Sequence, residues 1–230
     1  MQKAKCTAIV LAAGQGKRMG TKVQKQYLEI KGKPVLYYSL KVFEQSELID
    51  EIILVVGENQ REYCEKEIVS KYEISKVTKI VQGGAERYHS VWSGLQEIDA
   101  GYVFIHDGAR PFLNEEILHR VYDEVLFHKA CVVGMPVKDT IKIADAEGYA
   151  DMTPDRSMLW QIQTPQVFET SLIKEAYKKL MQSDTIKVTD DAMVVEQMLG
   201  GKVKLVFGSY ENIKITTPED LEIAEIFLKK

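Results

Sequence analysis

Several kinds of residue are scarce in this chain of 230 residues. It has three cysteines, Cys6, Cys64 and Cys131, which lie far apart and form no C-x-x-C pair. An odd number of isolated cysteines argues against a disulfide framework and favours a reducing, cytoplasmic compartment. Glycine and proline contribute only 15 and 6 residues, whereas 45% of the residues are hydrophobic. This composition excludes a disordered or fibrous chain and is typical of a globular protein.

An excess of positive charge and a long apolar run are also missing. The 30 lysines and arginines stand against 34 acidic residues, for a net charge of -4, which argues against a nucleic-acid partner. The longest apolar stretch, Cys6 to Ala13, is far shorter than the roughly 20 residues of a membrane-spanning helix, so we expect no membrane partner. Lys3 and Lys5 precede it as in a signal peptide, but the run leads into Gly14-Gln15-Gly16 and not into a cleavage site. We interpret it as the first buried strand.

Short β-branched segments alternate with helical patterns through the first part of the chain. The predicted strands are Thr7–Ala13, Ile52–Gly57, Val77–Gln82, Tyr102–Asp107 and Cys131–Val137. The predicted helices are Pro34–Gln45, Glu58–Tyr72, Arg87–Ile98 and Asn114–His128, the last with Asn114 as its N-cap. Because the strands are apolar on both faces, they favour a mostly parallel sheet covered by helices on both sides. The fold class is therefore a three-layer α/β fold.

The alternation breaks after Val137. Thr140–Ile143 and Tyr149–Thr153 flank Ala146-Glu147-Gly148, a pattern that predicts a hairpin arm at about residues 138–158. A lone hairpin is marginal in water, so we expect it to pack against a second copy of the chain in a homodimer. The remaining predicted elements are strands Trp160–Phe168 and Val203–Phe207, helices Thr170–Gln182 and Asp190–Leu199, and a helix from Pro218. We expect residues 1–230 to form one domain that carries the arm.

The segment from Gly14 to Gln26 has the clearest chemical character. It holds the cations Lys17, Arg18, Lys22 and Lys25, and it contains no acidic residue. It follows a buried strand, and ligands bind at that edge of open α/β sheets. Glycines there let backbone N–H groups approach an anion, and the cations neutralise it, which predicts a polyphosphate site. Met19 stands where both the dinucleotide-binding motif and the Walker A motif need glycine, so neither motif is present.

The motifs of the chain resemble those of one enzyme family. Leu11–Met19 resembles the L-A-A-G-x-G-x-R-M signature of the nucleotidyltransferases that activate sugar phosphates, and Lys25-Gln26-Tyr27-Leu28 resembles their second signature. Five further motifs are Gly83–Val91, His106–Pro111, Asp139-Thr140, Thr164–Gln166 and Asn212–Lys214. In order and spacing they resemble the 2-C-methyl-D-erythritol 4-phosphate cytidylyltransferase family of non-mevalonate isoprenoid synthesis. The resemblance extends from about Thr7 to Leu228 and implies a Rossmann-like nucleotidyltransferase sheet.

The resemblance implies that CTP and methylerythritol phosphate give 4-diphosphocytidyl-2-C-methylerythritol and pyrophosphate. The nucleophile would be a phosphate monoester, whose second pKa is about 6, so it needs no strong general base. Cations that offset the charge of the transition state would be the catalytic tool. By resemblance, Arg18 and Lys25 stabilise the transition state and the departing pyrophosphate, and Lys214 contacts the α-phosphate and positions the attacking phosphate. Arg156 and Thr140 would reach the acceptor phosphate of the neighbouring subunit, so each site would be complete only in the dimer.

The resemblance also implies a set of substrate contacts. Asp107 and Arg110 would hold the hydroxyl-bearing part of the acceptor, together with Thr164 and Thr189. The expected nucleotide contacts are Ala12, Ala13, Gly14, Gly16, Gly83, Gly84 and Ser90. Mg²⁺ would accompany CTP, bound mainly through the phosphates. Asp107 is the one carboxylate that we nominate as a possible protein ligand.

Two other functions remain open from the sequence. A ribitol 5-phosphate cytidylyltransferase would share the CTP-binding loop and differ in the acceptor pocket. A non-catalytic nucleotide-binding subunit could share the fold, but retention of Arg18, Lys25, Arg156 and Lys214 argues against it. The chain also departs from the family at two positions. Gln24 replaces a common proline before the signature lysine, which we expect to loosen the loop, and Ala85 replaces a polar residue after the glycine pair.

Overall fold

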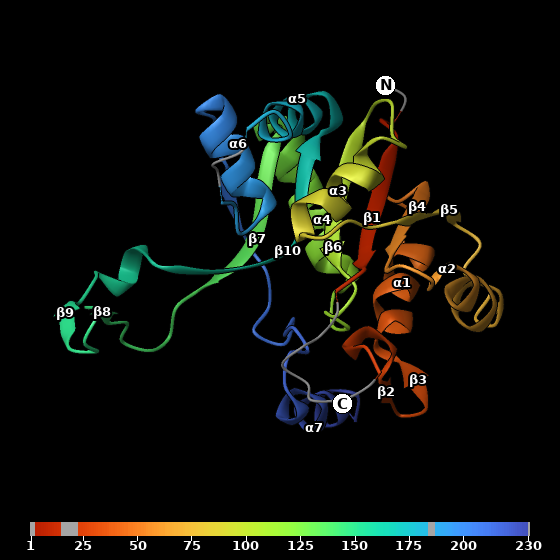
Figure 1. The fold of residues 1–230 in the computed structure, drawn as a ribbon, viewed down its shortest axis with the longest axis horizontal. Coiled ribbons are helices and arrows are strands. Elements are labelled where there is room, and N and C mark those ends of the chain that lie inside the picture. The colour runs from red at the N-terminus through yellow and green to blue at the C-terminus, as the bar shows by residue number, and fades with distance from the viewer. Residues whose placement is uncertain (1–2, 15–22, 184–186, 230) are drawn as a thin grey trace.

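A seven-stranded sheet forms the centre of the protein, in the order β11-β7-β10-β6-β1-β4-β5 (Figure 1). The computed structural model describes residues 3–14, 23–183 and 187–229. The strands are β1 (Cys6–Ala12), β4 (Glu51–Val56), β5 (Val77–Gln82), β6 (Tyr102–Asp107), β7 (Ala130–Pro136), β10 (Trp160–Glu169) and β11 (Lys204–Phe207). β10 runs antiparallel to β6 and β7, and the other pairings are parallel. The predicted mostly parallel sheet is therefore confirmed.

Helices pack on both faces of this sheet. One face carries α1 (Val35–Gln45), α4 (Glu115–His128) and α2 (Arg61–Tyr63), which continues as a π-helical segment, Cys64–Ser70. The other carries α3 (Arg87–Leu95), α5 (Thr170–Leu180) and α6 (Asp191–Leu199). Successive strand residues point to opposite faces, so Ala8 and Val10 pack with the first group and Ile9 with the second. This two-sided burial explains why the strands are apolar throughout.

Side chains that satisfy free backbone N–H groups mark where several helices begin. The Asn114 side chain accepts from the Ile117 N–H, 3.0 Å away, which confirms the predicted N-cap of α4. Asp190 caps α6 in the same way by accepting from Met193. The last helix, α7 (Pro218–Phe227), starts with proline in its first turn and with a capping box between Thr217 and Asp220.

Two small ladders lie outside the central sheet. β2 (Glu29–Ile30) pairs with β3 (Lys33–Pro34), and this ladder packs near α7. β8 (Ile143–Ala144) and β9 (Ala150–Met152) form the predicted hairpin, which projects far from the sheet (Figure 1). β8 begins three residues later than predicted, and both strands are short. In the turn between them, the Asp145 carboxylate accepts from the N–H groups of Glu147 and Tyr149. None of the helices that the structure describes is long and apolar enough to cross a bilayer.

His106 lies next to the last residue of the central strand β6 and is a buried histidine held in its neutral form. Its Nδ1 lies 2.9 Å from Thr164 Oγ1, and its Nε2 lies 3.2 Å from the Arg110 carbonyl oxygen. Thr164 Oγ1 accepts from the Asp107 N–H, which leaves the hydroxyl proton for His106 Nδ1. The ring then donates from Nε2 to the carbonyl. Burial lowers the pKa of His106 from 6.5 to about 4.

We expect the protein to lose stability as the pH falls from 6.5 to 4. Over that range the unfolded chain binds a proton on His106 that the folded protein excludes. This one group contributes a slope of up to about 1.4 kcal/mol per pH unit. His106→Gln should flatten the dependence by that amount when urea denaturation is measured at each pH. His119→Gln, on the exposed side of α4, is the control and should keep the wild-type slope. Equal slopes in the two variants would contradict the assignment.

Candidate active site

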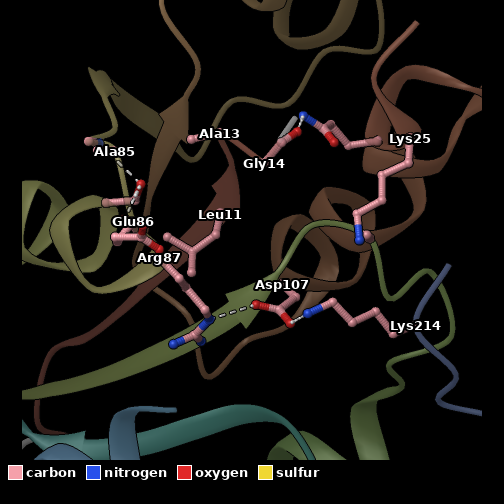
Figure 2. Close-up of a pocket in the computed structure, with 13 residues that line it drawn as sticks. Leu11, Ala13, Gly14, Lys25, Ala85, Glu86, Arg87, Asp107 and Lys214 are labelled. Atoms are coloured by element: carbon pink, nitrogen blue, oxygen red, sulfur yellow. Dashed lines mark hydrogen bonds and ion pairs between the residues drawn. The ribbon is translucent and has the colours of Figure 1, made fainter. Parts of the chain in front are cut away.

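A cavity of about 560 Å³ opens at the carboxyl ends of β1 and β6. It is lined by Leu11, Ala13, Gly14, Lys25, Gln26, Gly84, Ala85, Glu86, Arg87, Ser90, Asp107, Ala109 and Lys214. These residues come from the end of β1, the turn that begins at Lys25, the start of α3, the end of β6 and the segment before α7 (Figure 2). The cavity thus lies at the sheet edge where ligands bind in open α/β folds.

Asp107 lies in the wall of this cavity between two cations (Figure 2). Its Oδ2 is 2.6 Å from Lys214 Nζ, and its Oδ1 is 3.2 Å from Arg87 Nε. Burial would raise the pKa of this carboxyl group, but Arg87 and then Lys214 hold the pKa of Asp107 well below its usual range. Asp107 is therefore ionised throughout the neutral range.

Arg87 is fixed from behind by Asp191, in the first turn of α6. Its two terminal nitrogens donate to the two Asp191 oxygens, each at 2.8 Å. Asp191 is fully buried, and the Tyr177 hydroxyl also donates to it at 2.6 Å. The N–H groups of Asp191 and Ala192 donate to Gln166 Oε1. Although burial opposes the charge, Asp191 and Asp107 raise the pKa of Arg87 well above its ordinary value.

The glycine-containing segment is held by a side-chain amide. Gln26 Nε2 donates to the carbonyl oxygens of Ala12 and Gly14, at 2.6 and 3.0 Å, and to Gln24 Oε1 at 2.9 Å. Gln26 is 2% exposed. Its side chain therefore joins the end of β1 to the turn that carries Lys25.

A second pair of glycines brings the start of α3 against the end of β1. A Cβ on Gly83 would lie 2.6 Å from the Ala13 Cβ and 2.6 Å from Ser90 Oγ, closer than real side chains approach. Glycine at this position therefore allows two loops to meet. The neighbouring Gly84 N–H donates to Ser90 Oγ at 3.2 Å.

Lys214 is positioned by the segment on which it lies. Asn212 is fully buried, and its Nδ2 donates to the Thr164 carbonyl oxygen at 2.9 Å. Arg110 Nη1 donates to the Asn212 carbonyl oxygen at 2.8 Å. The Ile215 N–H donates to the Ala109 carbonyl oxygen. These contacts anchor the backbone on both sides of Lys214.

The structure brings together about half of the residues that the sequence predicts for the site. The predicted residues that line the cavity are Ala13, Gly14, Lys25, Gly84, Ser90, Asp107 and Lys214. Four more predicted residues lie directly behind that lining and contact it: Ala12, Gly83, Arg110 and Thr164. Thr140, Arg156 and Thr189 lie elsewhere, the first two in the arm. Arg18 and Gly16 lie outside the described residues.

Three further predicted residues, none of which lines the cavity, also make contacts within the chain. Arg110 supports the backbone before Lys214, and the Thr164 hydroxyl is shared between Asp107 and His106. Arg156 Nη1 donates to the Lys138 carbonyl oxygen at 2.8 Å in the exposed arm. These contacts show how each side chain is held in its own chain.

Sequence reasoning did not assign four polar residues in or behind the cavity wall to the site: Gln26, Glu86, Arg87 and Asp191. Arg87 opens α3, where the positive end of the helix dipole disfavours a cation. A cation in that position needs an acidic partner, so the unfavourable placement of Arg87 is a signal in the sequence that could have identified it as a site residue. Asp191 carried only the signal of a helix start, next to its capping neighbour Asp190.

The described residues contain no group of three or more His, Cys, Asp or Glu side chains that could hold a metal ion. Both oxygens of Asp107, the predicted candidate ligand, already face cations. Mg²⁺ prefers oxygen ligands in an octahedral arrangement. The described residues therefore do not fit a magnesium ion held by the protein itself.

The contacts of Gln26 can be tested through stability. Gln26→Met should lower the free energy of unfolding by about 1–3 kcal/mol, because it removes the donor to the Ala12 and Gly14 carbonyls. Gln24→Met is the matched control, since it removes only one acceptor of the Gln26 amide. Urea denaturation should show the smaller loss in the control. Equal losses would mean that the contacts to the backbone contribute nothing.

Comparisons with known proteins agree on one family. The chain matches the sequence model of the 2-C-methyl-D-erythritol 4-phosphate cytidylyltransferase family over residues 6–230. A protein of that name from Lachnospira eligens is 58% identical over 225 residues, which cover 97% of this chain and 99% of the relative. Another, from Caldanaerobacter subterraneus subsp. tengcongensis, is 50% identical over 226 residues, with 97% and 99% covered. The crystal structure of 4-diphosphocytidyl-2C-methyl-D-erythritol synthase from Anaerococcus prevotii gives a TM-score of 0.86 at 38% identity, covering 99% of this chain and 97% of that chain.

Proposed function

Because the chain belongs to the 2-C-methyl-D-erythritol 4-phosphate cytidylyltransferase family, we propose that it transfers the cytidylyl group of CTP to methylerythritol phosphate. The observation that carries the proposal is the cavity at the end of β1 and β6. It combines glycine-containing backbone for a polyphosphate with the cations Lys25 and Lys214 and the ionised Asp107.

The chemistry needs charge compensation more than proton transfer. An oxygen of the acceptor phosphate forms a bond to the α-phosphorus of CTP, while the bond from that phosphorus to the β-phosphate oxygen breaks. The attacking phosphate is largely a dianion at neutral pH, so no base has to remove a proton. His106, which precedes Asp107 behind the cavity wall, is buried with both ring nitrogens engaged. This arrangement suits a reaction without a general base.

Cations that line the cavity would stabilise the transition state. Lys25 extends from the side of Gly14 toward Asp107 and Lys214 (Figure 2). Lys25 would offset charge on the leaving pyrophosphate, and Lys214 would contact the α-phosphate and the attacking phosphate. Arg18, assigned with Lys25 by the family signature, lies outside the described residues.

The backbone around the cavity would bind the nucleotide. Ala13 and Gly14, with the proposed contacts Ala12 and Gly16, would face the phosphates, and Gly84 and Ser90 at the start of α3 would face the nucleoside. Asp107 would hold acceptor hydroxyls. Mg²⁺ would enter as the complex of CTP, bound through phosphate oxygens.

The arm would complete the site of a second subunit. We propose that residues 1–230 form one nucleotidyltransferase domain, and that two copies pair through the arm. Apolar side chains are exposed along it: Tyr149 is 70% exposed, Met152 52% and Met158 78%. Thr140 and Arg156 lie on this arm and do not line the cavity of their own chain. An Arg fork matches phosphate oxygens, so Arg156 would bind the acceptor phosphate of the partner.

The cysteines support a cytoplasmic location. Cys6, Cys64 and Cys131 are buried and free. Burial raises the pKa of Cys6 and of Cys131 to about 12, so these two thiols stay protonated and unreactive.

The choice of acceptor tests the proposal. With CTP and Mg²⁺, pyrophosphate release should favour methylerythritol 4-phosphate over ribitol 5-phosphate by at least about 10²-fold in kcat/KM, or about 2.7 kcal/mol of transition-state discrimination. The reverse preference would make the protein a ribitol 5-phosphate cytidylyltransferase that uses the same cationic residues. If neither acceptor gives pyrophosphate release although CTP still binds, the protein is a nucleotide-binding subunit.

Mixing two inactive variants tests the shared site. Lys25→Ala removes a residue of the cavity, and Arg156→Ala removes a residue of the arm. Heterodimers of the two contain one intact site, so random reassociation should restore about a quarter of the wild-type activity. Lys25→Ala mixed with Lys214→Ala is the control, because both residues line the same cavity and no intact site can form. If the first mixture stays as inactive as the control, the arm does not act across the dimer.

A further inference from the structure

We propose that Asp191 is a positioning residue for nucleotidyl transfer: its fork with Arg87 keeps Arg87 against Asp107, and so allows Lys214 to leave Asp107 for a substrate phosphate. The inference rests on the proposed function and assigns a role to a residue that lies behind the cavity wall. It is carried by the chain of contacts from Asp191 through Arg87 to Asp107 and Lys214.

The side chains at the two ends of this series of contacts differ in their exposure to solvent. The Asp191 side chain is 0% exposed, and those of Asp107, Arg87 and Lys214 are 11%, 28% and 35% exposed. Asp191 holds Arg87 through two hydrogen bonds of 2.8 Å, one to each carboxylate oxygen, which is the bidentate pairing that suits a guanidinium and a carboxylate. Lys214 holds Asp107 by a single ammonium contact of 2.6 Å. Arg87 is therefore the fixed cation and Lys214 the one that can move.

Asp191 is itself immobilised by its surroundings. The Tyr177 hydroxyl from α5 donates to Oδ1, and the Asp191 N–H donates to Gln166 Oε1 on β10. The Gln166 amide also donates to Asp190, the N-cap of α6. Contacts from α5, β10 and α6 thus fix the carboxylate that in turn fixes Arg87.

Among the four side chains joined by ion pairs, from Asp191 to Lys214, the charges balance while Lys214 stays on Asp107. Asp107 and Asp191 carry two negative charges, and Arg87 and Lys214 carry two positive charges. When a phosphate draws Lys214 away, the buried Asp107 carboxylate needs a cation that stays in contact with it, because an unpaired charge inside a protein is costly and Arg110 acts on it without forming an ion pair. Arg87 can remain paired with Asp107 only if it does not itself move to the substrate phosphate. The fork with Asp191 prevents this movement.

Neutralising Asp191 should therefore affect the reaction through Arg87. In Asp191→Asn, one oxygen of the fork becomes an NH₂ group that faces an Arg87 nitrogen, so the bidentate pair is lost. Arg87 then has one acidic partner and can bind phosphate in competition with Lys214. We expect kcat to fall by up to about 10²-fold because the reacting groups are misplaced. The KM for CTP should stay the same or decrease, because the cavity gains a mobile cation.

A double-mutant cycle on the full-length enzyme distinguishes this role from simple destabilisation. Pyrophosphate release is measured for wild type, Asp191→Asn, Arg87→Gln and the double variant, with KM for CTP and for the acceptor. If Asp191 acts through Arg87, the double variant is no slower than Arg87→Gln. A structural role would lower kcat by the same factor in both backgrounds and would overturn the proposal. So would an Asp191→Asn variant with wild-type kcat.

Two further variants keep the test decisive. Arg87→Lys retains the charge but not the fork, so Asp191→Asn should cost less in that background than in wild type, even if Arg87→Gln is too slow to measure. Ser46→Ala removes a buried hydroxyl that donates to Glu115 at 2.8 Å, away from the residues that line the cavity. It should lower thermal stability and leave kcat unchanged.

An inactive wild type would instead refute the proposed function, and the role of Asp191 with it, before any variant is compared.

Discussion

The site depends on one constraint: the carboxylate of Asp107 is buried at the end of β6 and must stay paired with cations. Those cations come from distant parts of the chain, Arg87 from the start of α3 and Lys214 from the segment before α7. A buried charge without a partner would favour unfolding or protonation. The need to pair Asp107 therefore also fixes where two separate segments meet, and the cavity lies between them.

The two cations of Asp107 are supported in different ways. Arg87 is held by a second carboxylate inside the protein, whereas Lys214 is placed by the backbone around it, through Asn212 and Arg110. Backbone anchoring fixes the start of the lysine side chain and leaves its ammonium group free to change partners. A carboxylate fork fixes the guanidinium itself. This division of roles is suited to a site that must receive and release anions.

The sequence predicted the sheet well because its signals are local. Continuous apolar strands such as β1 and the cap at Asn114 are read from neighbouring residues, and the family motifs located Asp107 and Lys214. The pair of Arg87 and Asp191 was not predictable in the same way, since the residues are 104 positions apart. They meet only after α3, α5 and α6 have packed on one face. No short pattern encodes that contact.

Gln24 shows how a departure from a family pattern can keep the same local structure. We expected this residue, which stands where the family often has proline, to loosen the turn that carries Lys25. Its backbone has φ −66° and ψ 140°, and a proline ring would impose the same φ. Its side chain also accepts from the Gln26 amide at 2.9 Å, which proline could not do. The turn therefore has a backbone that proline could adopt and is held by a hydrogen bond instead of a ring. Because this bond ends on Gln26, the residue that holds Ala12 and Gly14, Gln24 takes part in the link between Lys25 and the end of β1.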